Sequence, residues 1–195
     1  MKVKIFKIFE LDYGQIICHG NHSIYRGFNC QTKSPVAIKE YINSEDISQK
    51  ERQNLTCFKN LNHPNLLEIL DFGEAKMPER RSASFYIVSE FFKCSLEDYL
   101  QNQKTGLQES EVRLFGKQIV NAAVEMMSQN IIFDYLNMKN MYLCQNPVKT
   151  VKIAIASLMD SSLLNLLPIT DSVYFAPEVL EGNAQYVDSR LSSNT

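Results

Sequence analysis

The side chains most able to do chemistry are few and scattered in this sequence. His19 and His22 stand three residues apart in a turn-rich stretch, a spacing that could suggest a metal site. Two imidazoles without a neighbouring carboxylate or thiol make a weak site, so we expect no metal there. The five cysteines form an odd, scattered set without a C-x-x-C pair, which is typical of reduced thiols rather than of a zinc centre.

Composition and charge exclude several classes of protein. The 195 residues are 45% hydrophobic and 22% charged, the values of a globular chain that can bury a core. The net charge is −2, so we expect neither nucleic acid nor an anionic membrane as a partner. No apolar run approaches the roughly 20 residues of a membrane span, and the opening residues lack the apolar stretch of a signal peptide. We therefore expect a cytoplasmic protein.

The elements that must position any site differ between the two halves of the chain. Short apolar runs separated by turn signals, such as those at 12–14 and 33–35, predict an antiparallel sheet in the first half. A helical stretch over 45–61, with Ser44 as its cap, ends before His63-Pro64. The runs expected to form strands are 5–9, 15–18, 24–28, 36–42, 66–72 and 84–91.

After residue 92 the spacing of the apolar residues changes from that of strands to that of helices. A short helix is predicted over 95–101 with Ser95 as its cap, followed by a longer one over 109–129. The longer helix should bury one face, which is formed by Val112, Phe115, Ile119, Ala122 and Met126. Brief apolar runs at 140–143 and 151–155 follow. A sheet-rich half joined to a helical half predicts an α+β fold of two lobes with a cleft between them.

The segment Val36-Ala37-Ile38-Lys39 resembles the lysine strand of protein kinases. Four further landmarks follow in the order of that family. They are His63-Pro64-Asn65, Tyr86-Ile87-Val88-Ser89-Glu90-Phe91-Phe92, Ser95-Leu96-Glu97-Asp98-Tyr99-Leu100 and Phe175-Ala176-Pro177-Glu178-Val179-Leu180. The resemblance spans residues 12–182 and implies a two-lobed protein kinase-like fold. The small lobe, an antiparallel sheet with the hinge, would span 1–92, and a mainly helical, incomplete large lobe would span 93–195.

The resemblance also implies where a nucleotide would bind. The amine of Lys39 would reach the α- and β-phosphates of ATP, and Asn140 matches a metal ligand of the catalytic loop. Tyr142 stands where the family has a compact aliphatic residue beneath the purine. Its ring could fill the pocket, stack on the base or rotate into the core of the lobe. The residues expected around a nucleotide are Lys39, Ile24, Ala37, Glu90, Phe92, Asn140 and Tyr142.

Three positions that carry carboxylates in active kinases hold other residues here. Tyr135 stands at the position of the catalytic aspartate, and a phenol with a pKa of about 10 cannot accept a hydroxyl proton at pH 7. Ile155 replaces the metal-binding aspartate and offers no oxygen to Mg²⁺. Asn54 replaces the helix glutamate that pairs with the lysine. Asp134 is adjacent to Tyr135 but out of register, so we expect it to be a surface or loop carboxylate.

Two other sequence features bear on the site. Ile17, His19 and His22 occupy the positions of the three loop glycines, whose lack of Cβ lets backbone amides approach phosphate in this family. Asp71-Phe72-Gly73 has the letters of the metal-binding motif of the family. It lies before the hinge strand, however, so its position disqualifies it.

These substitutions predict a pseudokinase, that is, a kinase-like signalling domain which is catalytically impaired and acts through protein partners or by switching conformation. We expect no metal and no firmly bound cofactor, and binding of ATP without Mg²⁺ is left open as the less favoured case. The alternative is a divergent, active serine/threonine kinase that uses Asp134 and either Glu51 or Asp160 as substitutes. A non-functional remnant is a third reading.

The end of the sequence falls where the central large-lobe helix of the family would begin. We expect either a fragment of a longer protein or a partner that covers the apolar face of the 109–129 helix. The hydroxyls expected in the activation segment, as candidate phosphorylation sites, are Ser161, Ser162, Thr170 and Ser172.

Overall fold

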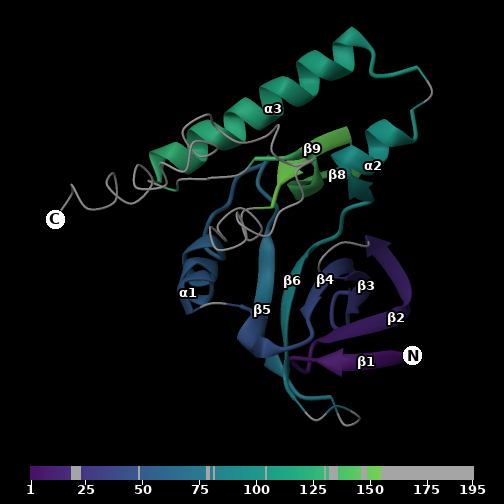
Figure 1. The fold of residues 1–195 in the computed structure, drawn as a ribbon, viewed down its shortest axis with the longest axis vertical. Coiled ribbons are helices and arrows are strands. Elements are labelled where there is room, and N and C mark those ends of the chain that lie inside the picture. Colours follow the sequence, from purple (N-terminus) through teal and green to yellow (C-terminus); the bar gives the residue numbers. More distant parts are fainter. Residues whose placement is uncertain are drawn as a thin grey trace, which may run out of the picture.

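The computed structural model of this chain describes most of the first 154 residues (Figure 1). The described residues are 1–18, 23–47, 49–77, 80, 82–103, 105–129, 131, 136–145 and 149–154, without the side chains of 46, 50, 51 and 145. All statements below concern these residues.

Six strands form one antiparallel sheet in the order β1-β2-β3-β4-β6-β5. They are β1 (Lys2–Ile5), β2 (Phe9–Cys18), β3 (Ile24–Asn29), β4 (Pro35–Tyr41), β5 (Ile69–Ala75) and β6 (Ser84–Glu90). A 3-10 turn, η1 (Ser44–Asp46), and a helix, α1 (Gln49–Phe58), connect β4 to β5. The sheet and α1 make up one end of the molecule (Figure 1).

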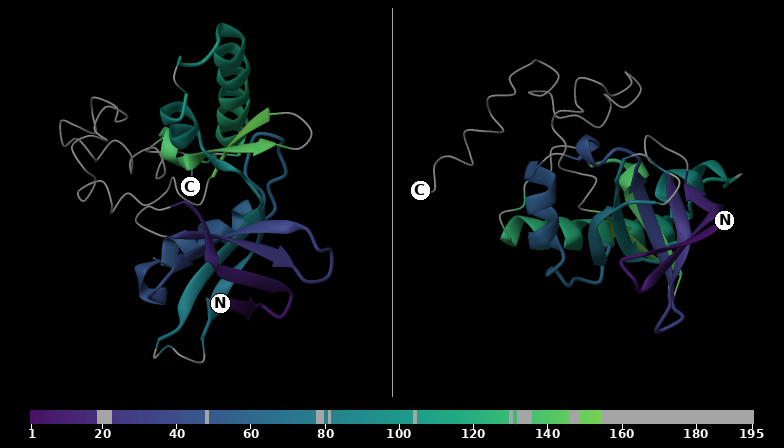
Figure 2. Two further views of the ribbon diagram at one scale, coloured as in Figure 1. Left: turned by 90° about the vertical axis from the view of Figure 1, so that its right-hand side faces the viewer. Right: turned by 90° about the horizontal axis from the view of Figure 1, so that it is seen from below.

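The other end holds a three-stranded sheet and two helices (Figure 2). Its elements are β7 (Cys94–Ser95), α2 (Leu96–Gln101), α3 (Glu109–Ser128), η2 (Met138–Asn140), β8 (Met141–Gln145) and β9 (Lys149–Ile153). The predicted α+β fold, with a curled antiparallel sheet in its first half, is confirmed. Among the described helices, none combines the length and apolar character that crossing a bilayer requires.

The two faces of the six-stranded sheet bury different sets of residues. Tyr41 of β4 packs with Leu55 and Phe58 of α1 in a large core that continues to α3 and β9. Since successive side chains of a strand point to opposite faces, Val36 and Ile38 lie on the other face. There they belong to what we call the outer core, which consists of Ile5, Phe9, Leu11, Val36, Ile38, Met77, Tyr86 and Val88.

A carboxylate is buried beside the outer core. Glu40 of β4 is 2% exposed and accepts hydrogen bonds from the hydroxyls of Tyr13 (3.0 Å) and Tyr86 (2.8 Å). The guanidinium of Arg80 completes the group with a 2.6 Å contact to the same oxygen. A buried carboxylate is stable only when paired and hydrogen-bonded, and these three partners meet that requirement.

The expectation of one strand over 5–9 is wrong. β1 ends at Ile5 and β2 begins at Phe9, and in the turn between them Phe6 (φ 48°) and Lys7 (φ 65°) have left-handed backbone conformations. This conformation costs about 1–2 kcal/mol for a residue with a Cβ. Tight hairpin turns of this kind usually carry Asn-Gly or Asp-Gly, so the sequence gives no sign of this one.

The turn expected at 12–14 is also wrong, because these residues lie inside β2. Asp12 and Gly14 form a local irregularity there: the Oδ1 atom of Asp12 accepts a hydrogen bond from the Gly14 amide at 3.0 Å. The pairing of β2 with β3 shifts register between Leu11 and Ile16. A bulge of this kind bends a strand without ending it.

The predicted helices are found, with corrections at their ends. The stretch 45–61 divides into η1 and the shorter α1, and Ser44 lies inside η1 instead of capping a helix. Ser95 does cap α2, as predicted, since its Oγ accepts a hydrogen bond from the Asp98 amide at 3.0 Å.

Helix α3 buries only part of the face that its sequence predicts. Phe115, Ala122 and Met126 are buried, as expected. Val112 is instead 53% exposed and belongs to an apolar stripe along α3. The exposed side chains of this stripe are Val112, Val120, Val124 and Met127.

Two glycine-to-alanine changes, one in the close-packed sheet and one in an open position on α3, should have opposite effects on stability. A Cβ at Gly27 of β3 would meet Ile38 and would lie 2.6 Å from the Glu10 carbonyl oxygen. We expect Gly27→Ala to lower the free energy of unfolding by about 1–3 kcal/mol. Gly116→Ala, in an open position on α3, should raise it by about 0.5–1 kcal/mol. Urea denaturation would measure both, and equal effects would contradict the close packing at Gly27.

Candidate functional site

A third buried cluster lies between the six-stranded sheet and the strand pair β8–β9. We call it the cleft cluster, and its members are Ile24, Ala37, Leu67, Phe92, Tyr142, Cys144 and Ala154. Four of the residues that the sequence places around a nucleotide meet here, namely Ile24, Ala37, Phe92 and Tyr142. They come from β3, β4, the segment after β6, and β8. That they bind a nucleotide stays a prediction.

The centre of the cleft cluster is a pair of stacked aromatic rings. The ring centroids of Phe92 and Tyr142 are 3.9 Å apart and their planes differ by 19°. Phe92 is 2% exposed and Tyr142 is 5% exposed. Burial raises the pKa of the Tyr142 phenol, so this side chain is neutral at physiological pH. The sequence leaves three places open for the Tyr142 ring: in the pocket, stacked on a base, or in the core of the lobe. In the structure the ring packs with Ile24, Ala37 and Phe92 in the cleft cluster.

The end of β2 covers this cluster from one side. Ile17 and Cys18 pack against it, and the Cys18 thiol contacts the Oδ2 atom of Asp98 on α2 at 3.7 Å. The hydroxyl of Ser95 donates to the same oxygen at 2.6 Å. Burial raises the pKa of Cys18 to about 11, so it is a protonated thiol that can act as the donor. A hydrogen bond from the Cys18 thiol to the Asp98 carboxylate therefore links the last residue of β2 to α2.

Lys39 lies on β4 with its amine 5.0 Å from the centroid of the Tyr41 ring. An ammonium at this distance over an aromatic face is stabilised by the ring quadrupole. Asn54, at the position of the family's helix glutamate, lies on α1. Its Nδ2 atom is buried and has no hydrogen-bond acceptor within the described part of the chain. The backbone of Glu51 lies on the same helix, and its side chain is not described.

Three of the predicted nucleotide-binding residues lie outside the cleft cluster, namely Lys39, described above, Glu90 and Asn140. The carboxylate of Glu90, at the end of β6, accepts hydrogen bonds from Lys152 Nζ (2.6 Å) and from the Glu68 amide (2.9 Å). Asn140 ends η2, and its carbonyl oxygen accepts a hydrogen bond from the Ala154 amide at 2.9 Å.

Several residues of the sequence interpretation fall outside the described part of the chain. They are His19, His22, Asp134, Tyr135, Ile155 and Asp160, together with the candidate phosphorylation sites. Asp71-Phe72-Gly73 lies within β5, which precedes β6 in the chain.

Sequence reasoning missed Leu67, Cys144, Ala154 and the contact of Cys18 with Asp98. Cys144 could have been found, since it stands two residues after Tyr142 on a strand and therefore points to the same face. The contact of Cys18 with Asp98 joins positions 80 residues apart, and no local pattern records such a separation.

The packing of Tyr142 bears on the predicted site for a purine base. A base would have to lie between the small-lobe wall, Ile24 and Ala37, and the residue at position 142, and the ring of Tyr142 already packs in this cluster. Among the described residues, no three His, Cys, Asp or Glu side chains gather as they would around a metal ion.

A curled sheet with a lysine on its central strand, a helix packed behind it and a linked second sheet define the protein kinase class. Residues 12–191 match the protein kinase domain family, and the chain belongs to that family.

The chain is similar to named serine/threonine kinases. It is 30% identical over 194 residues to serine/threonine-protein kinase unc-51 of Caenorhabditis elegans, covering 90% of this chain and 22% of the relative. It is 27% identical to cyclin-dependent kinase F-3 of Oryza sativa subsp. japonica (84% and 37% covered) and 26% identical to serine/threonine-protein kinase ULK1 of Homo sapiens (88% and 17%). The chain thus spans between 17% and 37% of the length of these relatives.

The buried amide of Asn54 yields a prediction with an internal control. Asn54→Leu removes a buried donor that has no acceptor among the described residues, so the free energy of unfolding should stay constant or rise by about 1 kcal/mol. Asn65→Leu removes an amide that donates to the Val151 carbonyl at 3.2 Å. This change should cost about 1–3 kcal/mol. Denaturant titration measures both, and a large loss for Asn54→Leu would indicate an unrecognised polar partner.

Proposed function

We propose that this chain is a kinase-family domain that does not transfer phosphate and that acts by binding other proteins or by switching conformation. The observation that carries the proposal is the stacked pair Phe92–Tyr142 in the cleft cluster. In this family the base of ATP lies between the two lobes, so a cleft closed by side chains supports a role that does not depend on nucleotide.

The residues around the lysine support the same proposal. Phosphoryl transfer depends on metal, lysine and base acting together, and the sequence has Tyr135, Ile155 and Asn54 at the three carboxylate positions. An amide at position 54 carries no charge with which to hold an ammonium, and the amine of Lys39 lies over the Tyr41 ring.

A protein partner is supported by the surface of α3. Val112, Val120, Val124 and Met127 are each more than half exposed along one helix, and contiguous apolar surface of this kind marks interaction sites. All five cysteines are free thiols, which supports a reducing, cytoplasmic compartment.

A second candidate is a divergent, active serine/threonine kinase. It is favoured by the retention of Lys39 and Asn140 at their family positions and by the names of the relatives, which are serine/threonine kinases.

The filled cleft predicts how the protein responds to nucleotide. In a thermal-shift titration, the unchanged protein should show no shift of Tm with ATP, with or without Mg²⁺, because the Tyr142 ring excludes the base. Tyr142→Leu, which restores a compact aliphatic side chain, should gain a shift with adenosine. A ligand at about 100 times its Kd stabilises by about 2.7 kcal/mol, which is readily measured.

The matched control is Tyr142→Phe, which keeps the ring and should stay unresponsive. Each variant is compared with its own Tm without ligand, since truncation also costs stability. A shift of the unchanged protein that Mg²⁺ strengthens would contradict the exclusion of nucleotide.

An activity assay separates the two candidate functions. We expect no phosphate transfer from ATP to a generic protein substrate with Mg²⁺ or Mn²⁺. Turnover that is lost in Lys39→Ala would establish the active kinase instead.

A further inference from the structure

The first eleven residues precede the part of the chain that matches the kinase family, yet they supply much of the outer core. Ile5, Phe9 and Leu11 are 1%, 2% and 0% exposed. They pack with Val36 and Tyr86, among others. Strand β1 thus lies before the matched range and contributes Ile5 to the outer core.

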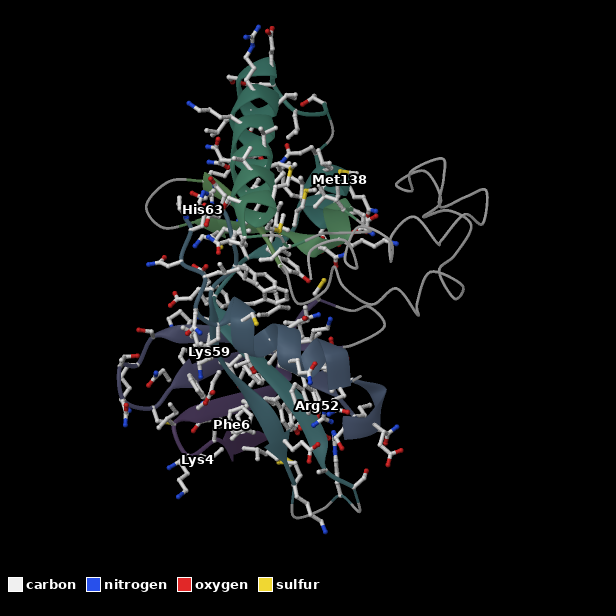
Figure 3. The ribbon with its side chains drawn as sticks, turned by 90° about the vertical axis from the view of Figure 1, so that its left-hand side faces the viewer. Lys4, Phe6, Arg52, Lys59, His63 and Met138 are labelled. Carbon is white, nitrogen blue, oxygen red and sulfur yellow. The ribbon has the colours of Figure 1, made fainter. Side chains whose placement is uncertain are left out.

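Strand β1 is held by contacts that any copy of the same segment could make. It pairs with β2 through the register Lys2↔Asp12, Val3↔Leu11, Lys4↔Glu10 and Ile5↔Phe9. Phe6 reaches the strands beyond, where its ring lies edge-to-face with Tyr86 at 6.5 Å. A ring atom of Phe6 is 3.5 Å from the point where a Cβ on Gly73 would lie. In Figure 3, Phe6 lies against the sheet, whereas Lys4 projects away from it.

The connection between β1 and β2 is, by contrast, unfavourable. Phe6 and Lys7 are both left-handed, although neither is a glycine or an asparagine. Residues with a Cβ avoid this region, and short hinge loops under strain favour exchange of elements between copies. Extending the turn removes the strain, and the paired residues 2–5 of β1 keep the same partners on β2 when a second copy supplies the strand.

We propose that two copies of this chain exchange strand β1, so that β1 of each pairs with β2 of the other. The second copy is the occupant because its residues 1–6 already match the site in sequence and register. In the exchanged dimer, residues 1–18 form one long strand. Since each register pair sums to 14, residue 7 lies on the two-fold axis, with Lys7 opposite Lys7 of the second copy.

The position of Lys7 gives the dimer a distinct salt dependence. Like charges directly opposite on neighbouring strands repel, and salt screens this repulsion. The dimer of the unchanged protein should therefore be weak at low ionic strength and should strengthen as salt is added.

Two substitutions at Lys7 should move the dimerisation in opposite directions. Lys7→Gly removes the strain of the closed turn and disfavours the extended strand, so the Kd of the dimer should rise by about tenfold or more. Lys7→Val disfavours the closed turn, favours the strand and removes the charge pair. Its Kd should fall by about tenfold or more, and its salt dependence should disappear. Sedimentation velocity of the full chain over a concentration series measures all three proteins.

Lys33 provides a matched control. It is also a left-handed lysine (φ 61°), but it lies in the turn between β3 and β4. This turn stays closed in both the monomer and the exchanged dimer. Lys33→Gly should therefore leave the Kd of the dimer unchanged.

A disulfide identifies the exchanged strand directly. Lys4 and Glu10 are register partners, so in Lys4→Cys/Glu10→Cys the disulfide joins two chains in the exchanged dimer and stays within one chain in the monomer. Oxidation with diamide followed by a non-reducing gel should give covalent dimer that increases with concentration and with added Lys7→Val. Single Lys4→Cys controls for the natural thiols.

Either of two results would overturn the proposal. One is an exclusively intrachain disulfide at all concentrations, also in the Lys7→Val background. The other is a dimer whose Kd is the same in the unchanged, Lys7→Gly and Lys7→Val proteins, which would place the contact on another surface such as the α3 stripe. If the double-cysteine protein does not fold, the sedimentation series decides alone.

Discussion

The contact between the rings of Phe92 and Tyr142 is the constraint on which the relation between the two sheets depends. One ring follows the last strand of the six-stranded sheet and the other belongs to β8. Backbone hydrogen bonds run beside them: the Leu67 amide donates to the Ile153 carbonyl and the Ile153 amide to the Asn65 carbonyl, each at 2.9 Å. Side chains and backbone groups of the two sheets thus contact each other directly.

The other face of the six-stranded sheet is also covered by side chains from separate parts of the chain. The outer core depends on residues that precede the family match, and the buried Glu40 is satisfied by one tyrosine from β2, one from β6 and an arginine from the connection between β5 and β6. Both faces of the sheet are therefore closed by groups from distant parts of the chain.

The sequence predicts those parts of the fold that have a local pattern. The helical period of α3, the cap at Ser95 and the apolar runs of β4 and β6 all depend on neighbours within a few residues. The resemblance then assigns four members of the cleft cluster correctly to one place. The missed parts are non-local or lack their usual signal. The turn at Phe6-Lys7 contains no glycine, and Val112 is exposed although the helical period puts it near the buried face.

The adjacent charges of β4 have a further consequence for how the chain folds. Lys39 lies on the same face of β4 as Tyr41, whereas Glu40 lies on the face of the outer core, where it meets Tyr13, Tyr86 and Arg80. A slip of β4 by one residue against β3 and β6 would exchange these faces. It would bury an ammonium among apolar residues and strand the carboxylate away from Arg80. Because both changes cost free energy, this pair of adjacent charges favours the observed register of β4 over a register shifted by one residue.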